Sequence, residues 1–260
     1  MDAPRTLASL FFLQNYYLNF APYQGPIGQH WSLSVEEHFY ALFPLLLLWL
    51  AVTKRPVVRV LLGLCAMALA IRVAYVMFLP VDAEQLRDQI YRSSETRIDS
   101  LLFGCLLAVL ARGDFVKRYA GVAMLFAGLT LILIAMIFVE FPLFRDTLKF
   151  SLQPIGVAVA MAAILYAKPG YIINVVRWVL NSPPAVFIGR ISFSAYLTHT
   201  AMFHTVRVTL GGDPSWWLLM PAAFVATILV SWLSFRYVEQ PMIRIGKQWT
   251  IGRRLRPAEG

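Results

Sequence analysis

The order of apolar and polar positions along the chain predicts a bundle of membrane-spanning helices. A span needs about 17–25 mainly apolar residues. Seven segments meet or approach this length, and the third of them is short and begins with polar residues. An eighth segment, residues 6–21, is apolar but carries Gln14, Asn15 and Asn19, so it is a full or a partial span. We therefore expect an all-α, polytopic transmembrane helical bundle with about 7–8 spans. The seven segments cover residues 38–53, 57–80, 95–111, 119–139, 150–167, 185–207 and 216–238.

Lysine and arginine between these segments predict an orientation in the membrane. One set of loops carries them, as does the tail after Arg236; these loops are residues 53–59, 112–118 and 168–184. The alternate loops carry none, or a mixture of both signs; they are residues 21–37, 208–215 and 81–96. Cytoplasmic loops are the ones enriched in Lys and Arg. We therefore expect a multi-pass protein of the cell (inner) membrane with its C-terminus in the cytoplasm.

Composition agrees with a membrane protein. The 260 residues are 59% hydrophobic and 14% charged, whereas a soluble domain has about 25% charged residues. The net charge of +9 is concentrated in short loops and the tail, where it indicates topology and contact with anionic membrane lipids rather than nucleic-acid binding. Cys65 and Cys105 lie in apolar runs, so we expect buried thiols and neither a disulfide framework nor a metal site. One membrane domain is expected over residues 1–243, followed by a basic cytoplasmic tail over 244–260.

Two adjacent carboxylates, Glu36 and Glu37, stand where the first long apolar segment begins. Ser34 followed by Glu37 fits a capping box, in which each side chain bonds the other residue's free backbone N–H. That structural reading explains Glu37 better than Glu36, which makes Glu36 the better candidate for proton transfer or for holding a cation. His38 lies one turn into the span and is expected to pair with Glu37 or Asp99.

A second group of charges lies on residues 92–104. Glu95 and Asp99 are four apart and share a helix face, whereas Arg97 and Asp99 are two apart, so each needs a partner from another helix. Two readings stay open here, an ion-pair network that anchors a short helix and a polar cavity. Gly104 is expected to allow close helix approach. Arg72 lies inside an apolar run, where it either snorkels to the bilayer edge or has an internal role.

A third group lies on residues 189–199. Ser192, Tyr196 and His199 are spaced four and then three apart, which places them on one helix face. A membrane histidine of this kind either satisfies a neighbouring helix by a hydrogen bond or takes part in catalysis, and the polar face favours a cavity.

The stretch 234–241 carries a fourth group. Arg236 and Glu239 are three apart, which predicts an ion pair that clasps the cytoplasmic end, and Pro241 is expected to end the helix. The motifs of the common soluble enzyme classes, such as G-x-S-x-G or a P-loop, do not occur in the sequence.

Four sequence blocks, in this order, resemble the signature of the acyltransferase-3 family of integral-membrane O-acyltransferases. They are WSLSVEEHFYALFP (31–44), RIDSLLFG (97–104), IGRISFSAYLTH (188–199) and SFRYVEQP (234–241). The resemblance implies transfer of an acyl group, commonly acetyl from acetyl-CoA, to hydroxyls of extracytoplasmic carbohydrates such as lipopolysaccharide, peptidoglycan or other polysaccharides and glycolipids. The resemblance implies that acyl-CoA is the donor substrate and that no cofactor is bound. It also implies which residues are candidates for catalysis and for substrate contact. Those expected in catalysis are Glu36, Glu37 and His199, and those expected to contact substrate are Arg97, Asp99, Tyr196, Trp31 and Ser34.

The chain also departs from that family pattern. Family members usually open with two further spans, the first of which carries an arginine and, about ten residues later, a histidine regarded as the catalytic base. A basic loop, whose arginines are thought to meet the donor, follows the second span. No such arginine–histidine pair precedes Trp31. The chain thus resembles the C-terminal two-thirds or so of such an enzyme, and we expect little turnover from it. The alternatives are a non-catalytic membrane fragment and a polytopic transporter or flippase.

Overall fold

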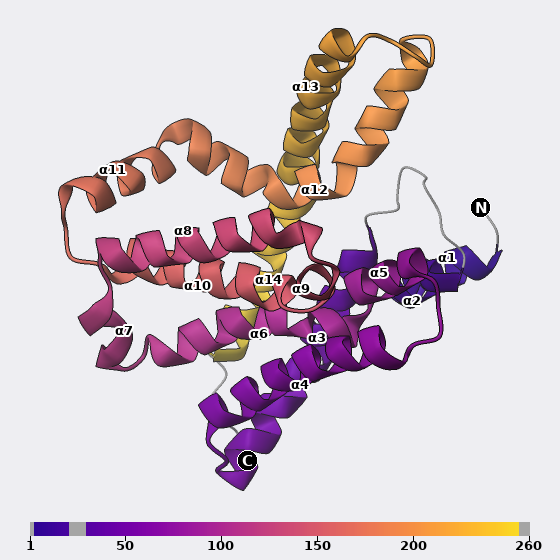
Figure 1. The fold of residues 1–260 in the computed structure, drawn as a ribbon. Helices are drawn as coiled ribbons and strands as arrows, with labels where there is room; N and C mark the ends of the chain where they lie inside the picture. Colours follow the sequence, from indigo (N-terminus) through magenta and orange to yellow (C-terminus); the bar gives the residue numbers. More distant parts are fainter. Residues whose placement is uncertain (1–2, 21–29, 255–260) are drawn as a thin grey trace. The chain divides into compact units, whose positions relative to one another are not determined.

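The computed structural model describes residues 3–20 and 30–254. Every regular element in these ranges is a helix, and no strand occurs among them. Contacts within the chain divide the described residues into two compact units, one ending at Trp178 and one beginning at Val179 (Figure 1). The predicted boundary at residue 244 falls within the last helix, and the predicted domain division stays a prediction.

The first unit contains the helices α1 to α10, a short 3-10 helix and most of α11. Their bounds are α1 Ala3–Leu10, α2 Gln14–Phe20, α3 Trp31–Thr53, α4 Val57–Phe78, α5 Ala83–Arg92, α6 Ser94–Leu110, α7 Asp114–Tyr119, α8 Val122–Ile137, η2 Phe138–Glu140, α9 Pro142–Asp146, α10 Lys149–Tyr166 and α11 Tyr171–Leu180.

The long helices follow the predicted apolar segments, but fewer of them are long enough to cross a membrane. Five described helices have the length and apolar character of a span, or six if α11 and the following helix count as one broken span. Helix α6 has 17 residues, which at about 1.5 Å per residue falls short of the roughly 30 Å hydrocarbon core. Segment 6–21 is broken between α1 and α2, where Phe12 has a φ of 55°. The predicted count of spans is therefore not confirmed, while the all-helical membrane architecture is.

Helix α6 lies at the centre of the first unit and packs against α3, α4, α5 and α10 (Figure 1). Apolar side chains of three helices form a core there, with Leu102 and Leu106 of α6 meeting Phe39 of α3 and Cys65 of α4. Both cysteines are free thiols; Cys65 is buried, as the sequence predicts, whereas Cys105 is only partly buried. The polar first turns of α6 precede these core residues in the helix, and they also lie among α3, α4, α5 and α10.

Helices α8 and α10 approach each other through glycine. A Cβ atom added at Gly128 would lie 2.6 Å from the carbonyl oxygen of Gly156 and 2.6 Å from the backbone nitrogen of Ala160. Small residues let membrane helices pack this closely, because there is no side chain between the two backbones. The expectation that Gly104 has this role is wrong, since a Cβ at Gly104 would meet nothing within 4 Å in the described structure.

The second unit is built on a pair of helices joined by a tight turn at Gly211 and Gly212, which have φ values of 97° and 88°. Ser194 Oγ lies 2.9 Å from Ser234 Oγ and Thr198 Oγ1 lies 3.1 Å from Ser231 Oγ, so hydroxyls line the helix–helix contact. The elements are α12 Pro183–Thr209, α13 Trp216–Ser234, the π-helix η3 Phe235–Glu239 and α14 Gln240–Arg254.

The C-terminal helix does not stop at Pro241, so that expectation is wrong. Helix α14 begins at Gln240 and continues to Arg254. Proline breaks a regular α-helix because it lacks an N–H and its ring meets the carbonyl four residues back. The π-helical turn ends at Glu239, two residues before Pro241, and changes that carbonyl spacing, which accounts for the continuation.

Candidate active site

A fully buried ion pair joins α4 to α6. Arg72 donates from its two terminal nitrogens to the two carboxylate oxygens of Asp99, at 3.1 and 2.7 Å, and neither side chain is exposed. The same guanidinium donates to the Thr96 carbonyl oxygen at 2.6 Å and to Ser151 Oγ of α10, and that hydroxyl donates to Asp99 at 2.7 Å. A buried charge needs such partners. Arg72 therefore does not snorkel, and the prediction that Asp99 pairs with another helix is confirmed.

Glu95 lies one turn before Asp99 on α6 and accepts hydrogen bonds from two tyrosines. The hydroxyl of Tyr16 lies 2.7 Å from Oε2, and the hydroxyl of Tyr75 lies 2.7 Å from Oε1. Burial, with the Glu95 carboxylate adding to it, raises the pKa of Tyr16. The phenol therefore keeps its proton at neutral pH and acts as a donor. These bonds hold the carboxylate between α2 and α4.

His38 of α3 supplies an imidazole beside this carboxylate. Its Nδ1 lies 2.7 Å from Ser94 Oγ, which also accepts from Asn15 Nδ2 at 3.0 Å. A serine oxygen can accept two hydrogen bonds and donate one, so this contact forms with either tautomer of a neutral His38. The structure thus gives His38 a serine partner, and the expected pairing with Glu37 or Asp99 is wrong.

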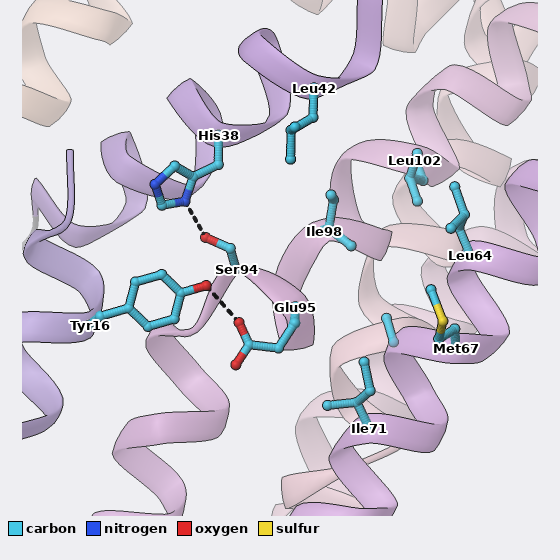
Figure 2. A pocket seen from close by; sticks show the side chains of 11 residues that line it. Tyr16, His38, Leu42, Leu64, Met67, Ile71, Ser94, Glu95, Ile98 and Leu102 are labelled. Atoms are coloured by element: carbon cyan, nitrogen blue, oxygen red, sulfur yellow. Dashed lines mark hydrogen bonds between the residues drawn. The ribbon is translucent and has the colours of Figure 1, made fainter. Parts of the chain in front are cut away.

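These polar groups stand at one end of a cavity of about 470 Å³. Figure 2 shows Tyr16, His38, Ser94 and Glu95 together at that end, with aliphatic side chains along the rest of the wall. The apolar lining residues are Leu42, Leu64, Met67, Ala68, Ile71, Ile98 and Leu102.

The polarity of the cavity falls along the axes of the helices that line it. On α6, Ile98 and Leu102 follow Ser94 by one and two turns, and on α3, Leu42 follows His38 by one turn. The loop charges predict that α3 and α6 both begin at the outer face of the membrane. The polar end is therefore expected near the outer surface and the aliphatic wall deeper in the bilayer.

Arg97 lies against aromatic rings beside this site. Its guanidinium carbon is 4.6 Å from the ring centroid of Phe150 and 5.6 Å from that of Tyr91. The ring of Trp31 lies 4.7 Å from that of Tyr91. Cation–π contacts of this kind hold a guanidinium without a carboxylate. Two predicted substrate-contacting residues, Arg97 and Trp31, thus share one aromatic cluster.

Comparison with known proteins identifies the family to which this helical protein belongs. A family model described as "Acyltransferase domain", that of acyltransferase-3, matches residues 6–236. The chain belongs to the acyltransferase-3 family. This confirms the resemblance carried by the four sequence blocks, because the match extends across both units.

Individual relatives of this family member are named as O-acetyltransferases. The chain is 26% identical over 262 residues to the peptidoglycan O-acetyltransferase OatA of Listeria monocytogenes and 24% identical over 260 residues to the O-acetyltransferase OatA of Staphylococcus aureus. Each alignment covers 92% of this chain but 40% and 41% of the relative. The chain thus spans about two-fifths of the length of the curated relatives it matches. No solved structure matches it.

The two acidic residues singled out in the family block have no structural role that the described residues reveal. Helix α3 begins at Trp31 with no side-chain cap, so Ser34 lies inside the helix and the capping box with Glu37 is wrong. Ser34 is buried, whereas Glu36 and Glu37 are both partly exposed. Within residues 3–20 and 30–254, neither forms an ion pair. Partly exposed carboxylates without a counterion suit proton transfer, and this role stays a prediction for both.

His199 and Tyr196 belong to the second unit, so their expected meeting with the acidic pair of the first stays a prediction. His199 is exposed, and its Nδ1 lies 2.7 Å from the carbonyl oxygen of Tyr196. A carbonyl accepts, so Nδ1 carries the proton and Nε2 of the neutral ring keeps its lone pair. The buried polar face of α12 is instead that of Ser194, which donates to Glu239.

Three site residues that sequence reasoning did not select come from helices other than α6. Tyr16, Tyr75 and Ser151 complete the Glu95 and Asp99 networks. A signal existed for two of them, because Tyr75 follows Arg72 by three residues and Tyr16 lies in the polar part of segment 6–21. Among the described residues, no three His, Cys, Asp or Glu side chains come together as a metal site would need.

Proposed function

We propose that this protein is a membrane O-acetyltransferase that transfers an acetyl group from acyl-coenzyme A to a hydroxyl of an extracytoplasmic carbohydrate or glycolipid. Membership of the acyltransferase-3 family supports the reaction type. The names of the relatives, one of them a peptidoglycan O-acetyltransferase, support acetyl as the group and a cell-envelope carbohydrate as the acceptor.

The observation that carries this proposal is the two-part cavity of the first unit. Its polar end offers a carboxylate, an imidazole and hydroxyls, which are groups that bind sugar hydroxyls by hydrogen bonds. Its aliphatic wall extends from Ser94 to Leu102, which is roughly 12 Å of helix at 1.5 Å per residue. A polar head toward the outer surface and an apolar part deeper in the bilayer is the arrangement of a glycolipid. Among carbohydrate acceptors, the cavity therefore favours one attached to a lipid chain.

The chemistry needs a base, a positioned hydroxyl and stabilisation of negative charge. The base removes the proton of the acceptor hydroxyl, its oxygen attacks the thioester carbonyl, and the carbon–sulfur bond breaks to leave a thiolate that takes a proton. Glu36, Glu37 and His199 are the candidate bases. His38 and Glu95 are the groups that we expect to bind and orient the acceptor.

The test is ester formation in cells. The protein is expressed in a strain lacking its own O-acetyltransferase, and alkali-labile acetate on the envelope glycans and glycolipids is measured by mass spectrometry. His38→Ala and Glu95→Gln should each lower ester formation about tenfold or more, as expected when one strong polar contact to substrate is lost. The matched control is His204→Ala, since His204 is exposed on α12.

Each result bears on a separate part of the proposal. Acetate on the envelope that depends on His38 and Glu95 but not on His204 supports it. Wild-type rates from both cavity variants would contradict the cavity as the acceptor site. No added ester from the wild-type protein, when it is present in the membrane, would contradict the acetyltransferase function and would agree with the little turnover that the sequence predicts.

A further inference from the structure

A second cavity lies wholly within the second unit and presents two arginines. It measures about 280 Å³, and its lining comes from α12 and from the continuous stretch of α13, η3 and α14. The lining residues are Phe187, Arg190, Trp232, Phe235, Arg236 and Gln240. Three aromatic side chains and two guanidinium groups in one small cavity form a combination that the proposed acceptor site does not use.

Neither arginine has a carboxylate partner among the described residues of this unit. Arg236 donates to the Gln240 side-chain oxygen at 3.1 Å. The carboxylate of Glu239, which the sequence predicts as its partner, accepts from Ser194 instead. Asp213 pairs with Arg207. Two positive charges thus face the cavity without a described counterion, and a bound anion would supply one.

The π-helix η3 explains why the predicted clasp does not form. In a regular α-helix Arg236 and Glu239, three apart, would lie side by side. The wider turn of Phe235–Glu239 shifts their relative direction, so that Glu239 reaches α12 while Arg236 lines the cavity. Single π-helical turns are rare and are found frequently at functional sites. The turn therefore frees Arg236 from Glu239 and leaves its guanidinium group at the cavity.

We propose that this cavity binds the phosphate-bearing adenosine end of the acyl-coenzyme A donor. Arginines bind phosphate through paired hydrogen bonds, and aromatic side chains stack on a nucleobase. The loop charges predict that the start of α12 and the end of α13 lie at the cytoplasmic face, where acyl-coenzyme A is present. The assignment rests on the proposed acetyltransferase function, and it places the donor's anchor in a different unit from the acceptor cavity.

Binding of coenzyme A itself tests the assignment without turnover. The full chain is reconstituted in phosphatidylcholine nanodiscs, and the equilibrium affinity for coenzyme A is measured by calorimetry. Arg190→Gln and Arg236→Gln should each weaken binding about tenfold or more, the effect of losing one charge-assisted phosphate contact. Arg207→Gln is the matched control, because Arg207 is an exposed arginine of the same helix with a partner in Asp213. Arg190→Lys and Arg236→Lys keep the charge and should bind with intermediate affinity.

The outcomes separate the possible sources of phosphate. Wild-type affinity in both glutamine variants, or in the lysine variants if a glutamine variant fails to fold, would overturn the assignment. Anionic lipids offer the same phosphate without the adenine ring. Retention of phosphatidylglycerol that is lost in the variants, with coenzyme A affinity unchanged, would overturn it in favour of a headgroup site. Arginine-dependent coenzyme A binding without any ester formation would support the donor site and contradict the acetyltransferase function.

Discussion

Replacing Asp99 with alanine should severely destabilise the first unit. The variant leaves Arg72 charged and without its carboxylate, at a position where the side chain is wholly inaccessible to water. It removes two hydrogen bonds, at 3.1 and 2.7 Å, and the acceptor of the Ser151 hydroxyl. The Thr96 carbonyl and the Ser151 hydroxyl remain as partners of Arg72, but neither carries a full charge. Breaking a buried pair by removing one member costs about 3–5 kcal/mol.

A matched control is present on the neighbouring helix. Asp88 pairs with Arg92 at 3.1 Å, but the two side chains are 34% and 18% exposed. Asp88→Ala should therefore cost about 0–1 kcal/mol. The assay is thermal unfolding of purified protein in detergent, followed by tryptophan fluorescence. At roughly 2–4 °C per kcal/mol for a chain of this size, Asp99→Ala should lower the unfolding temperature by about 6–20 °C.

A double variant separates lost charge from lost packing. Arg72→Met together with Asp99→Leu leaves no buried charge, so it should unfold at a higher temperature than Asp99→Ala alone. Two results would refute the reasoning. One is a loss for Asp99→Ala no larger than for Asp88→Ala. The other is a double variant whose loss of unfolding free energy equals the sum of the losses measured for Arg72→Met and Asp99→Leu singly.

The remaining predictions concern helix packing and topology. Gly128→Ala should lower the free energy of unfolding by roughly 1–3 kcal/mol, because its Cβ would lie 2.6 Å from the carbonyl oxygen of Gly156. A Cβ at Gly63 would meet nothing within 4 Å, so Gly63→Ala should not lower the unfolding temperature. Equal losses of stability in Gly128→Ala and Gly63→Ala would contradict the packing argument. A cysteine at position 213 should react with an impermeant maleimide in intact cells, whereas a cysteine at position 117 should react only after the cells are permeabilised. The reverse pattern would show that the loop charges were misread.

The sequence predicts the helices well because apolar length is a local property. Both ends of α4 lie within two residues of the predicted segment 57–80. Helix α3 is extended relative to the prediction and begins at Trp31 instead of residue 38. Its polar first turns are helical although no side chain caps them. Ser34 and Val35 are buried there, so packing against neighbouring helices determines this end rather than capping.

The site is less predictable because its partners are distant in sequence. The spacing of Glu95 and Asp99 places them correctly on one face of α6, and it indicates that Asp99 needs a partner elsewhere. Nothing local selects Arg72, or Ser151, which is 79 residues from Arg72. Such partners are chosen by which helices pack together, and apolar periodicity does not specify the order of helices around a bundle.

The face of α12 shows the same limit in a form that bears on mechanism. Spacing alone predicts the polar face with His199, and it does not say whether neighbouring helices cover that face. Ser194 is buried and bonded to Ser234 and Glu239, so its hydroxyl is committed to holding helices together. His199 is exposed, and the bond from Nδ1 to the Tyr196 carbonyl leaves Nε2 as an acceptor. An exposed imidazole whose neighbour fixes its tautomer is available to take a proton, which a buried hydrogen-bonding histidine would not be. The polar face that packing leaves uncovered is therefore the one on which a base can act.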